Sequence, residues 1–386
     1  MRVLHIGKFY PPVRGGMEMV LKLLCEGERQ YVDNHVLVAN NRPVTIHEEV
    51  QGVPVTRVAS YGMMHSVAIC PTFPMWWARQ QADIMVIHEP NPLGMLSYCL
   101  VRPPGKLVVW FHSEVIRQRQ LYALHRPFLR RVLRWADRII VSSPRLAEQA
   151  AELQDYQNKC VVVPFGVDPA RLQRTSKITM QVAELHNKYD GPIYLFVGRM
   201  VGYKGVEILI RALPGLPGKA IFVGEGPLLS RMQHLAADLG LEERAIFTGD
   251  IESEELIALY HACDVLVLPS VSRNEAFGVV QIEAMTCGKP VVSTNIQGSG
   301  VPWVNRHEET GLVVPAGDVA ALHGALEQLL HDPALRASLG AQGRQRVMTE
   351  FTLERMVSRM LAVYQDVTSA ATTSLAPLCS SAIVAD

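Results

Sequence analysis

The feature that most constrains this fold is a regular alternation of short apolar runs with amphipathic helical patterns. In the first half, runs rich in Val, Ile and Leu are expected to form strands at 2–7, 35–40, 53–59, 83–90, 106–112, 138–143 and 160–166. Such continuously apolar strands are typical of parallel sheets that are covered on both faces. Helical patterns fit between several of them, near 17–30, 92–101, 116–136 and 144–152. The order predicts a doubly wound α/β domain.

The same alternation begins again after an interruption at 167–191, which is expected to be a linker. Further strands are predicted at 192–198, 219–224, 244–249, 264–270 and 289–294, with helices near 204–213, 227–239, 252–262 and 277–287. A length of 386 residues also suits two domains. We therefore predict α/β domains at 1–170 and 171–350, with helices across 318–366 and a poorly ordered tail at 368–386.

Composition excludes several classes of function. Hydrophobic residues make up 48% of the chain and charged residues 19%, which argues against disorder. The formal net charge is +0, whereas nucleic-acid-binding proteins usually carry a basic excess. Residues 1–170 do hold 19 Lys and Arg against 14 Asp and Glu, from chance or because this half faces an anionic partner. The seven cysteines favour reduced thiols in the cytoplasm, and no apolar run suits a signal peptide or transmembrane helix.

Two glutamates frame the most distinctive segment. Glu275 and Glu283 flank an apolar stretch directly after the strand expected at 264–270. A helix that begins near Phe277 would aim its first N–H groups at the carboxyl edge of a parallel sheet, where open α/β folds bind ligands. The alternative is that one glutamate favours the helix dipole and the other faces solvent.

Glycine and basic residues follow other strands. Arg199 and Lys204 come after the strand at 192–198 and can converge on a diphosphate, although Lys204 could also be an ordinary surface residue. Gly15, Gly16 and Gly224 occupy strand-to-helix turns, which either admit a ligand or simply turn the chain.

One histidine ends a strand, and no metal motif is present. His112 closes the run at 106–112, where a histidine has either a structural role or faces a ligand cleft. The chain has no D-x-D motif and no zinc-ligand spacing, so no metal site is predicted. If a diphosphate leaves during a reaction at this site, cationic side chains and helix dipoles must stabilise it in place of Mg²⁺.

Taken in order, these motifs resemble those of retaining GT-B glycosyltransferases of the GT4 family. The resemblance rests on Gly-Gly-x-Glu at 15–18, Arg199 with Lys204, Gly-Glu-Gly-Pro at 224–227, and Glu275 with Glu283. It spans nearly the whole chain, and the combination is far more specific than any single motif. The family includes bacterial polysaccharide and O-antigen mannosyltransferases. It implies two Rossmann-like domains whose parallel sheets face a deep inter-domain cleft, and a helix at 351–367 that returns to the first domain.

The resemblance implies a role for each matched position. Gly15 and Gly16 would lie near the donor diphosphate, which Arg199 and Lys204 would hold as it leaves. His112 would contact the transferred sugar near its primary hydroxyl.

Other roles concern the sugar, the ribose and the base. Glu275 would bind sugar hydroxyls and Glu283 the ribose hydroxyls, so His112, Glu275, Arg199 and Lys204 form the expected catalytic set. Phe277, Gly278 and Val279 would offer backbone N–H groups to the sugar and phosphate, and the donor-binding residues Gly224, Gly249 and Ile251 would flank the nucleobase. The reaction would proceed with retention of anomeric configuration, without a tightly bound cofactor.

Donor and acceptor are expected from two further segments. Residues 293–318 resemble enzymes that use GDP-mannose, while UDP-sugars remain open. Residues 117–138 combine arginines with aromatic and aliphatic residues, and 73–80 adds aromatics. This pattern is typical of a helix on anionic lipid, or of one that packs on the sheet with its arginines in water. We expect a glycan acceptor linked to a polyprenyl diphosphate, peripheral contact at the cytoplasmic face of the inner membrane, and no nucleic acid.

Other classes fit less well. A UDP-N-acetylglucosamine 2-epimerase would share the two-domain shape but not the paired glutamates. A dehydrogenase would need the G-x-G-x-x-G fingerprint, which is absent. A non-catalytic sugar-nucleotide-binding protein would not need every matched polar position to be filled.

Overall fold

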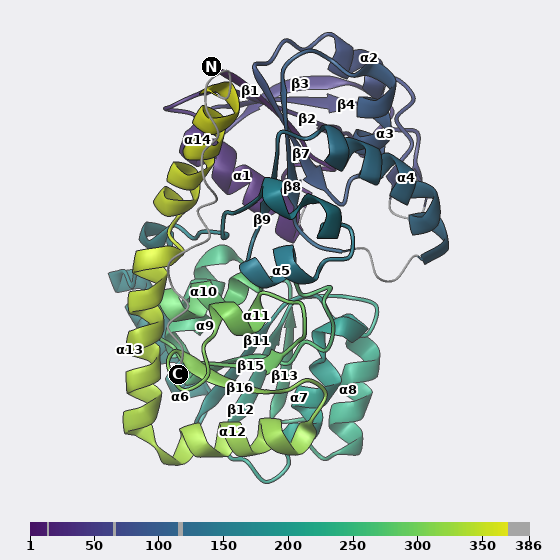
Figure 1. Cartoon of the computed structure of the whole chain (residues 1–386). Helices are drawn as coiled ribbons and strands as arrows, with labels where there is room; N and C mark the ends of the chain where they lie inside the picture. Colours follow the sequence, from purple (N-terminus) through teal and green to yellow (C-terminus); the bar gives the residue numbers. More distant parts are fainter. Residues whose placement is uncertain (14, 65–66, 115–118, 370–386) are drawn as a thin grey trace. The chain divides into compact units, whose positions relative to one another are not determined.

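The computed structural model describes residues 1–13, 15–64, 67–114 and 119–369. The chain forms two compact units, each built on its own β-sheet (Figure 1). The first unit contains Met1–Val141, Ala147–Val163 and the chain from Val357 onward, and the second contains Ser142–Leu146 and Pro164–Met356. Most of the tail expected at 368–386 lies outside the described residues.

The first unit has an eight-stranded sheet in the order β10-β9-β8-β7-β1-β2-β4-β3. Its strands are β1 (Arg2–Ile6), β2 (Asp33–Ala39), β3 (Ile46–Val50), β4 (Val53–Val58), β7 (Ile84–Glu89), β8 (Lys106–Phe111), β9 (Arg138–Val141) and β10 (Cys160–Val162). Every neighbouring pair is parallel except β3 with β4. A short hairpin, β5 (Met63–Met64) with β6 (Val67–Ala68), stands apart from this sheet.

Helices cover both faces of this sheet. Figure 1 shows α1 (Gly16–Glu28) and α14 (Leu353–Ser369) on one side, and α2 (Phe73–Ala78), α3 (Pro92–Val101) and α4 (Arg119–Trp135) on the other. The start of α3 is specified locally, because the side chain of Asn91 accepts a hydrogen bond from the N–H of Gly94 and Pro92 opens the helix. The short α5 (Pro144–Gln149) and the 3₁₀-helix η1 (Gln154–Lys159) lie between β9 and β10.

The second unit has a six-stranded, fully parallel sheet in the order β13-β12-β11-β14-β15-β16. The strands are β11 (Ile193–Val197), β12 (Lys219–Val223), β13 (Ala245–Gly249), β14 (Val265–Leu268), β15 (Val291–Asn295) and β16 (Gly311–Pro315). The helices are α6 (Ser176–Lys188), α7 (Val206–Ala212), α8 (Leu229–Asp238), α9 (Ser253–Ala262), α10 (Val279–Thr286), α11 (Val301–Val304), α12 (Val319–His331) and α13 (Pro333–Glu350). The 3₁₀-helices η2 (Pro169–Leu172) and η3 (Gly202–Lys204) complete it.

Two doubly wound sheets confirm the predicted fold class, and the structure corrects several details of the prediction. The linker expected at 167–191 contains α6, which buries only Ile178 and Val182 and so shows a weak apolar pattern. Strand β3 was missed because its charged residues face solvent at the sheet edge. Strand β16 was also missed. Helix α10 begins at Val279, because Gly278 has a φ of 74° and lies in the left-handed region.

The aromatic-rich segment at 73–80 is also mostly internal. Phe73 and Trp77 of α2 are fully buried, contrary to the exposed aromatics expected there. Trp77 lies against Tyr98 of α3, with ring centroids 5.6 Å apart. These two aromatic side chains of α2 therefore pack inside the unit. Met75 is a large apolar side chain of the same helix that is exposed.

Candidate functional site

The second sheet has a topological switch point between β11 and β14. These strands are neighbours, but the chain leaves β11 towards β12 on one side and β14 towards β15 on the other. In open α/β sheets, ligands bind at the carboxyl ends of the strands where this divergence opens a crevice. Lys204 follows β11 and Glu275 follows β14, so both belong to this crevice.

Lys204 and Glu275 form a close ion pair there. The Nζ of Lys204 lies 2.6 Å from Oε2 of Glu275, and both side chains are about nine-tenths buried. The hydroxyl of Ser270 donates to the same carboxylate oxygen at 3.1 Å. Burial acts to lower the pKa of Lys204, but the Glu275 carboxylate and Tyr203 outweigh it, so this pKa is raised. Lys204 is therefore a firmly charged cation at the switch point.

Arg199 lies in the same loop region and is exposed. Its charge acts on Lys204 strongly enough to oppose the rise in the lysine pKa. Gly198 leaves room for the lysine, since a Cβ there would stand 3.3 Å from Nζ of Lys204. An anion bound between the two cations would relieve their mutual repulsion.

The loops after β11, β12 and β13 are tied together by backbone contacts. The N–H of Met200 donates to the carbonyl of Glu225 at 2.8 Å, and that of Gly224 donates to the carbonyl of Gly249 at 2.8 Å. Gly224 has a φ of 119°, and a side chain there would overlap the backbone of Gly198. The nearby Ile251 is half-buried. These loops form one edge that presents backbone to a ligand.

The partner of Glu283 is a residue that the motif analysis did not single out. The hydroxyl of Tyr260, on α9, donates to Oε2 of Glu283 at 2.6 Å. Burial raises the pKa of Glu283, and the Tyr260 hydrogen bond opposes that rise. Phe277 is fully buried against Phe165, with centroids 5.0 Å apart, so only its backbone can meet a ligand. Gly278 and Val279 form the start of α10 itself.

In the first unit, the glycine turn precedes α1. Gly15 is the residue before the helix, and a Cβ on Gly16 would meet no atom within 4 Å. The carboxylate of Glu18 lies over Gly15. Burial raises the pKa of Glu18, while its own backbone N–H and Lys8 oppose the rise. The open space at Gly16 would let a ligand reach the backbone.

His112 lies at the end of β8 and is 3% exposed. Its Nε2 is 2.9 Å from Nδ1 of His88, on β7. Burial lowers the pKa of His112 to about 3, so the ring is neutral near pH 7. On the same strand as His88, Glu89 accepts from Nε2 of His125 at 2.8 Å.

The structure thus brings the predicted residues together in two groups. Arg199, Lys204, Gly224, Gly249 and Glu275 share the carboxyl edge of the second sheet, while Gly15, Gly16 and His112 follow strands of the first. Sequence reasoning missed Ser270, Tyr260 and His88 as partners. A polar residue inside an apolar strand, as at His88, was the available signal.

None of the described helices combines the length and apolar character that crossing a membrane requires. Among the described residues, His5, Cys25 and Glu28 are grouped closely enough to hold a metal ion. The ring nitrogens of His5 are already in hydrogen bonds, Nε2 with Glu28 at 2.6 Å and Nδ1 with His88 at 3.1 Å.

Two family descriptions match the two halves of the chain. Residues 14–171 match Glycosyltransferase Family 4, and residues 178–346 match Glycosyl transferases group 1. Among solved structures, the sucrose-phosphate synthase of Thermosynechococcus elongatus superposes with a TM-score of 0.81 and 24% identity, over 96% of this chain and 99% of that one.

Three characterised relatives align over most of the chain. The D-rhamnosyltransferase WbpZ of Pseudomonas aeruginosa is 35% identical over 91% of this chain and 92% of its own. The O-antigen chain mannosyltransferase C of Escherichia coli is 30% identical, over 94% and 98%. The GDP-mannose-dependent α-(1-6)-phosphatidylinositol monomannoside mannosyltransferase of Mycolicibacterium smegmatis is 34% identical, over 87% and 91%.

Proposed function

The chain belongs to glycosyltransferase family 4, with the GT-B fold, and from this premise we propose that it transfers D-mannose from GDP-mannose to a lipid-linked glycan. The acceptor would be a growing bacterial surface polysaccharide on a polyprenyl diphosphate. The product would retain the anomeric configuration of the donor.

The proposal of GDP-mannose as the donor rests on the sugars that the aligned relatives transfer. Two are mannosyltransferases, one of them GDP-mannose-dependent, and the third transfers D-rhamnose. D-Rhamnose is 6-deoxy-D-mannose, so both sugars carry the same axial hydroxyl at C2. A site for manno-configured sugars is the simplest property that such relatives share.

The switch-point cations suit the departure of GDP. Lys204 and Arg199 would bind the diphosphate and take up the charge that develops as the bond to the sugar breaks. Glu275 would bind sugar hydroxyls next to its lysine partner. This use of fixed cations requires no bound metal.

The state of Glu275 also bears on stereochemistry. Because its carboxylate is engaged by Lys204 and Ser270, it is a poor nucleophile for a covalent intermediate. We propose front-face attack: the bond from the sugar C1 to the phosphate oxygen breaks, the acceptor oxygen bonds to C1 on the same face, and its proton passes to a phosphate oxygen.

A second donor is favoured by one observation. The relative that is 35% identical transfers D-rhamnose, which lacks the hydroxyl at C6. His112, expected beside that position, would discriminate between the two sugars. A UDP-sugar stays an alternative that the donor assay below decides.

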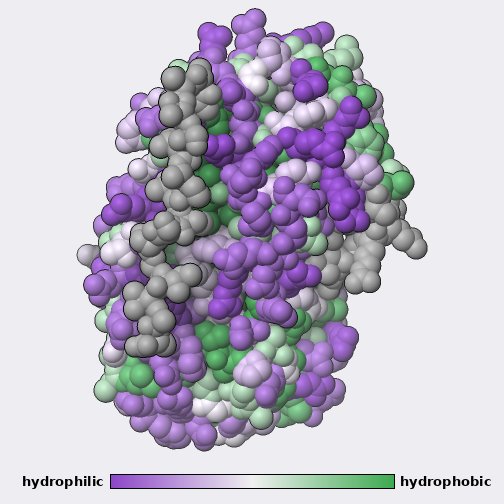
Figure 2. Space-filling view, in the orientation of Figure 1, coloured by the Kyte–Doolittle hydropathy of each residue, from purple (hydrophilic) through white to green (hydrophobic). Residues whose placement is uncertain are grey.

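The acceptor proposal rests on an exposed surface of the first unit, formed by the β5–β6 hairpin, α2, α3 and α4. We call it the apolar–basic surface. It contains exposed Tyr61, Met63, Met64, Met75, Leu96, Leu100, Leu124 and Phe128, together with Arg126, Arg130 and Arg134. Figure 2 shows apolar residues interspersed with hydrophilic ones in this part of the unit. In contrast, Leu129 and Leu133 of α4 pack inward. The side chains of 117–123 lie outside the described residues.

Exposed apolar residues among arginines suit the interface of an anionic bilayer. Such contact would hold the enzyme beside an acceptor whose lipid remains in the cytoplasmic face of the inner membrane. This localisation is part of the proposal.

The proposal is tested by incubating the purified enzyme with membranes and radiolabelled GDP-mannose, GDP-D-rhamnose or UDP-glucose. We expect label from GDP-mannose in the lipid extract, an α-linked product by NMR, and no transfer by E275A. Transfer from UDP-glucose alone would overturn the donor, and an inverted product would overturn the mechanism.

A further inference from the structure

A chain of buried hydrogen bonds ends at His112 in the first unit. It begins at Tyr364 of α14, whose hydroxyl donates to Oε2 of Glu28 at 3.0 Å. Oε1 of Glu28 is 2.6 Å from Nε2 of His5, and Nδ1 of His5 is 3.1 Å from Nε2 of His88. Nδ1 of His88 is then 2.9 Å from Nε2 of His112. Each of these side chains is at most 3% exposed.

The direction of this chain is set at Glu28. Its two carboxylate oxygens face three groups that can donate: the Tyr364 hydroxyl, the Asn34 amide at 3.3 Å and His5. Burial and the nearby Glu28 raise the pKa of Tyr364 well above its usual value, so this hydroxyl keeps its proton. All three groups are satisfied when the carboxylate only accepts, which places a hydrogen on Nε2 of His5.

When each of the three rings carries a single hydrogen, the contact with Glu28 determines the tautomers of His88 and His112. With its hydrogen on Nε2, His5 offers only a lone pair at Nδ1, so Nε2 of His88 must donate to it. The Nδ1 of His88 in turn accepts, and Nε2 of His112 must donate.

We propose that Glu28, His5 and His88 are positioning residues that hold His112 in the tautomer protonated at Nε2. Nδ1 of His112 then acts only as a hydrogen-bond acceptor. This proposal rests on the proposed function, because it matters for transfer if His112 contacts the sugar.

Burial supports neutral rings at His88 and His112. It lowers the pKa of His88 well below the usual range, and the neighbouring His112 and His5 lower it further. Stacking fixes the ring planes: His88 and His112 lie 5.2 Å apart at 19°, and Trp110 lies 5.2 Å from His112 at 8°. The rings cannot easily turn to exchange their nitrogens.

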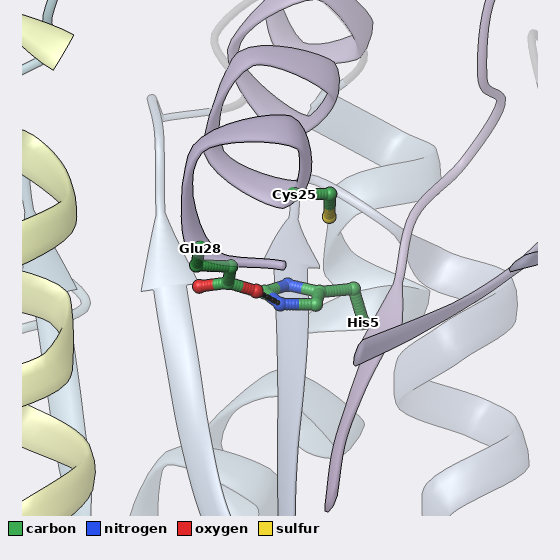
Figure 3. Close-up of side chains that lie close together, drawn as sticks. All are labelled: His5, Cys25 and Glu28. Atoms are coloured by element: carbon green, nitrogen blue, oxygen red, sulfur yellow. Dashed lines mark hydrogen bonds and ion pairs between the residues drawn. The ribbon is translucent and has the colours of Figure 1, made fainter. Parts of the chain in front are cut away.

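Figure 3 shows how His5, on β1, and Glu28, on α1, point toward one another, with the thiol of Cys25 beside them. Burial and Glu28 raise the pKa of Cys25 well above its usual value, so it is a neutral thiol. A metal ion here would have to displace a hydrogen bond of His5. The hydrogen bonds already engage both ring nitrogens of His5 and both carboxylate oxygens of Glu28 without a metal ion.

The tautomer has a consequence for the substrate. His88 already occupies Nε2 of His112, so a ring contact to the sugar must use Nδ1. Nδ1 can accept from a hydroxyl but cannot donate. A sugar hydroxyl that meets Nδ1 would therefore have to be the donor of the hydrogen bond, as the C6 hydroxyl of mannose can be.

The direct test is NMR on the full-length protein labelled with ¹⁵N-histidine, with resonances assigned by single substitutions. We expect scalar couplings across two N–H···N bonds, with the protons on Nε2 of His112 and of His88. Protons on Nδ1 of His88 and His5, or the absence of both couplings, would overturn the proposal. This readout does not depend on transferase activity.

The second arm compares variants at graded distances from His112. H88F cuts the chain beside His112, H88Q keeps a donor and an acceptor, and Y364F removes only the far hydroxyl. H47F, at an exposed histidine of β3, is the control for the same replacement. We expect kcat to fall about 10- to 100-fold in H88F, with smaller losses in H88Q and least in Y364F, and with the donor KM nearly constant.

The two arms separate the possible failures. Equal kcat for H88F and H47F, with H88F folded, would contradict the positioning role even if the enzyme transfers mannose. Conversely, if the expected couplings are observed in a protein that does not use GDP-mannose, the hydrogen-bond network is supported and the proposed function is contradicted.

Discussion

Nζ of Lys204 lies 2.6 Å from Oε2 of Glu275, although β12, β13 and β14 come between the two residues in the sequence. The pair crosses the switch point of the second sheet, where its two strands are neighbours. A cation and a carboxylate are thus already in place where a diphosphate and a sugar would meet. Such preorganisation avoids reorganisation cost during the reaction.

Removal of Glu275 and removal of Lys204 should affect GDP binding and transfer differently. We expect E275A to lower kcat by about 10²- to 10³-fold while the Kd for GDP changes little, because the change removes the proposed sugar contacts, together with the Lys204 ion pair and the Ser270 hydrogen bond, but leaves both cations for the diphosphate. K204A should weaken GDP binding and transfer together. Calorimetry measures the Kd for GDP, and initial rates measure kcat. K219A, at the amino end of β12, is the control. Wild-type kcat in folded E275A would contradict the site.

The Tyr260–Glu283 hydrogen bond should control the pH range of donor binding. Burial raises the pKa of Glu283 and the Tyr260 bond opposes this, so Y260F should raise that pKa further. If the ionised carboxylate binds ribose, GDP affinity falls as the pH falls through this pKa, and Y260F should shift the loss to higher pH. Calorimetry across pH measures it, with Y194F, a buried tyrosine of β11, as control. If GDP affinity depends on pH in the same way in Y260F and the wild type, Glu283 is not part of the donor site.

His112 should make stability depend on pH. Burial lowers its pKa to about 3 in the folded protein, below the unfolded value of about 6.5. The unfolded chain therefore binds the extra proton first, and stability falls as the pH drops from about 6.5 towards 3. Between pH 7 and 5, H112Q should lose up to about 2 kcal/mol less than the wild type in urea unfolding. Equal losses in H112Q and the wild type would contradict a neutral buried ring, with H47Q as control.

Gly205 should tolerate no side chain beside Lys204. Its φ is 68°, and a Cβ would overlap the carbonyl oxygen of Pro269 at the end of β14. Gly240 has almost the same φ, 66°, but open space around it. We expect G240A to cost about 1–2 kcal/mol for backbone strain alone, and G205A clearly more. Equal losses of unfolding free energy in G205A and G240A would mean that the loop after β11 moves away from β14 to accommodate the new side chain.

The apolar–basic surface should bind anionic vesicles. R126E with R130E reverses two charges on α4, and R42E with R174E makes the same change elsewhere on exposed arginines. In flotation with phosphatidylglycerol vesicles we expect only the first pair to reduce binding, and added salt to weaken the wild type. No wild-type binding at low salt would remove the membrane proposal.

The sequence predicted strands well where a single segment contains the signal, and candidate site residues were singled out in the same way. Glu275 stood out because its surroundings are apolar, and Lys204 because it follows a strand. Their contact depends on β11 pairing with β14, which nothing local specifies. The Tyr260 bond likewise needs α9 beside α10, and His88 looked like any polar residue in a buried strand.

The most direct test of the central claim is thermal stability of the protein with GDP, GDP-mannose, UDP, UDP-glucose, UDP-N-acetylglucosamine, UDP-galactose and NAD. A ligand that binds only the folded state raises the apparent Tm by mass action. We expect GDP and GDP-mannose to raise the apparent Tm, and we expect K204A to reduce this rise. A response to UDP-sugars instead would contradict the donor, and a response to NAD alone would contradict the proposed transferase.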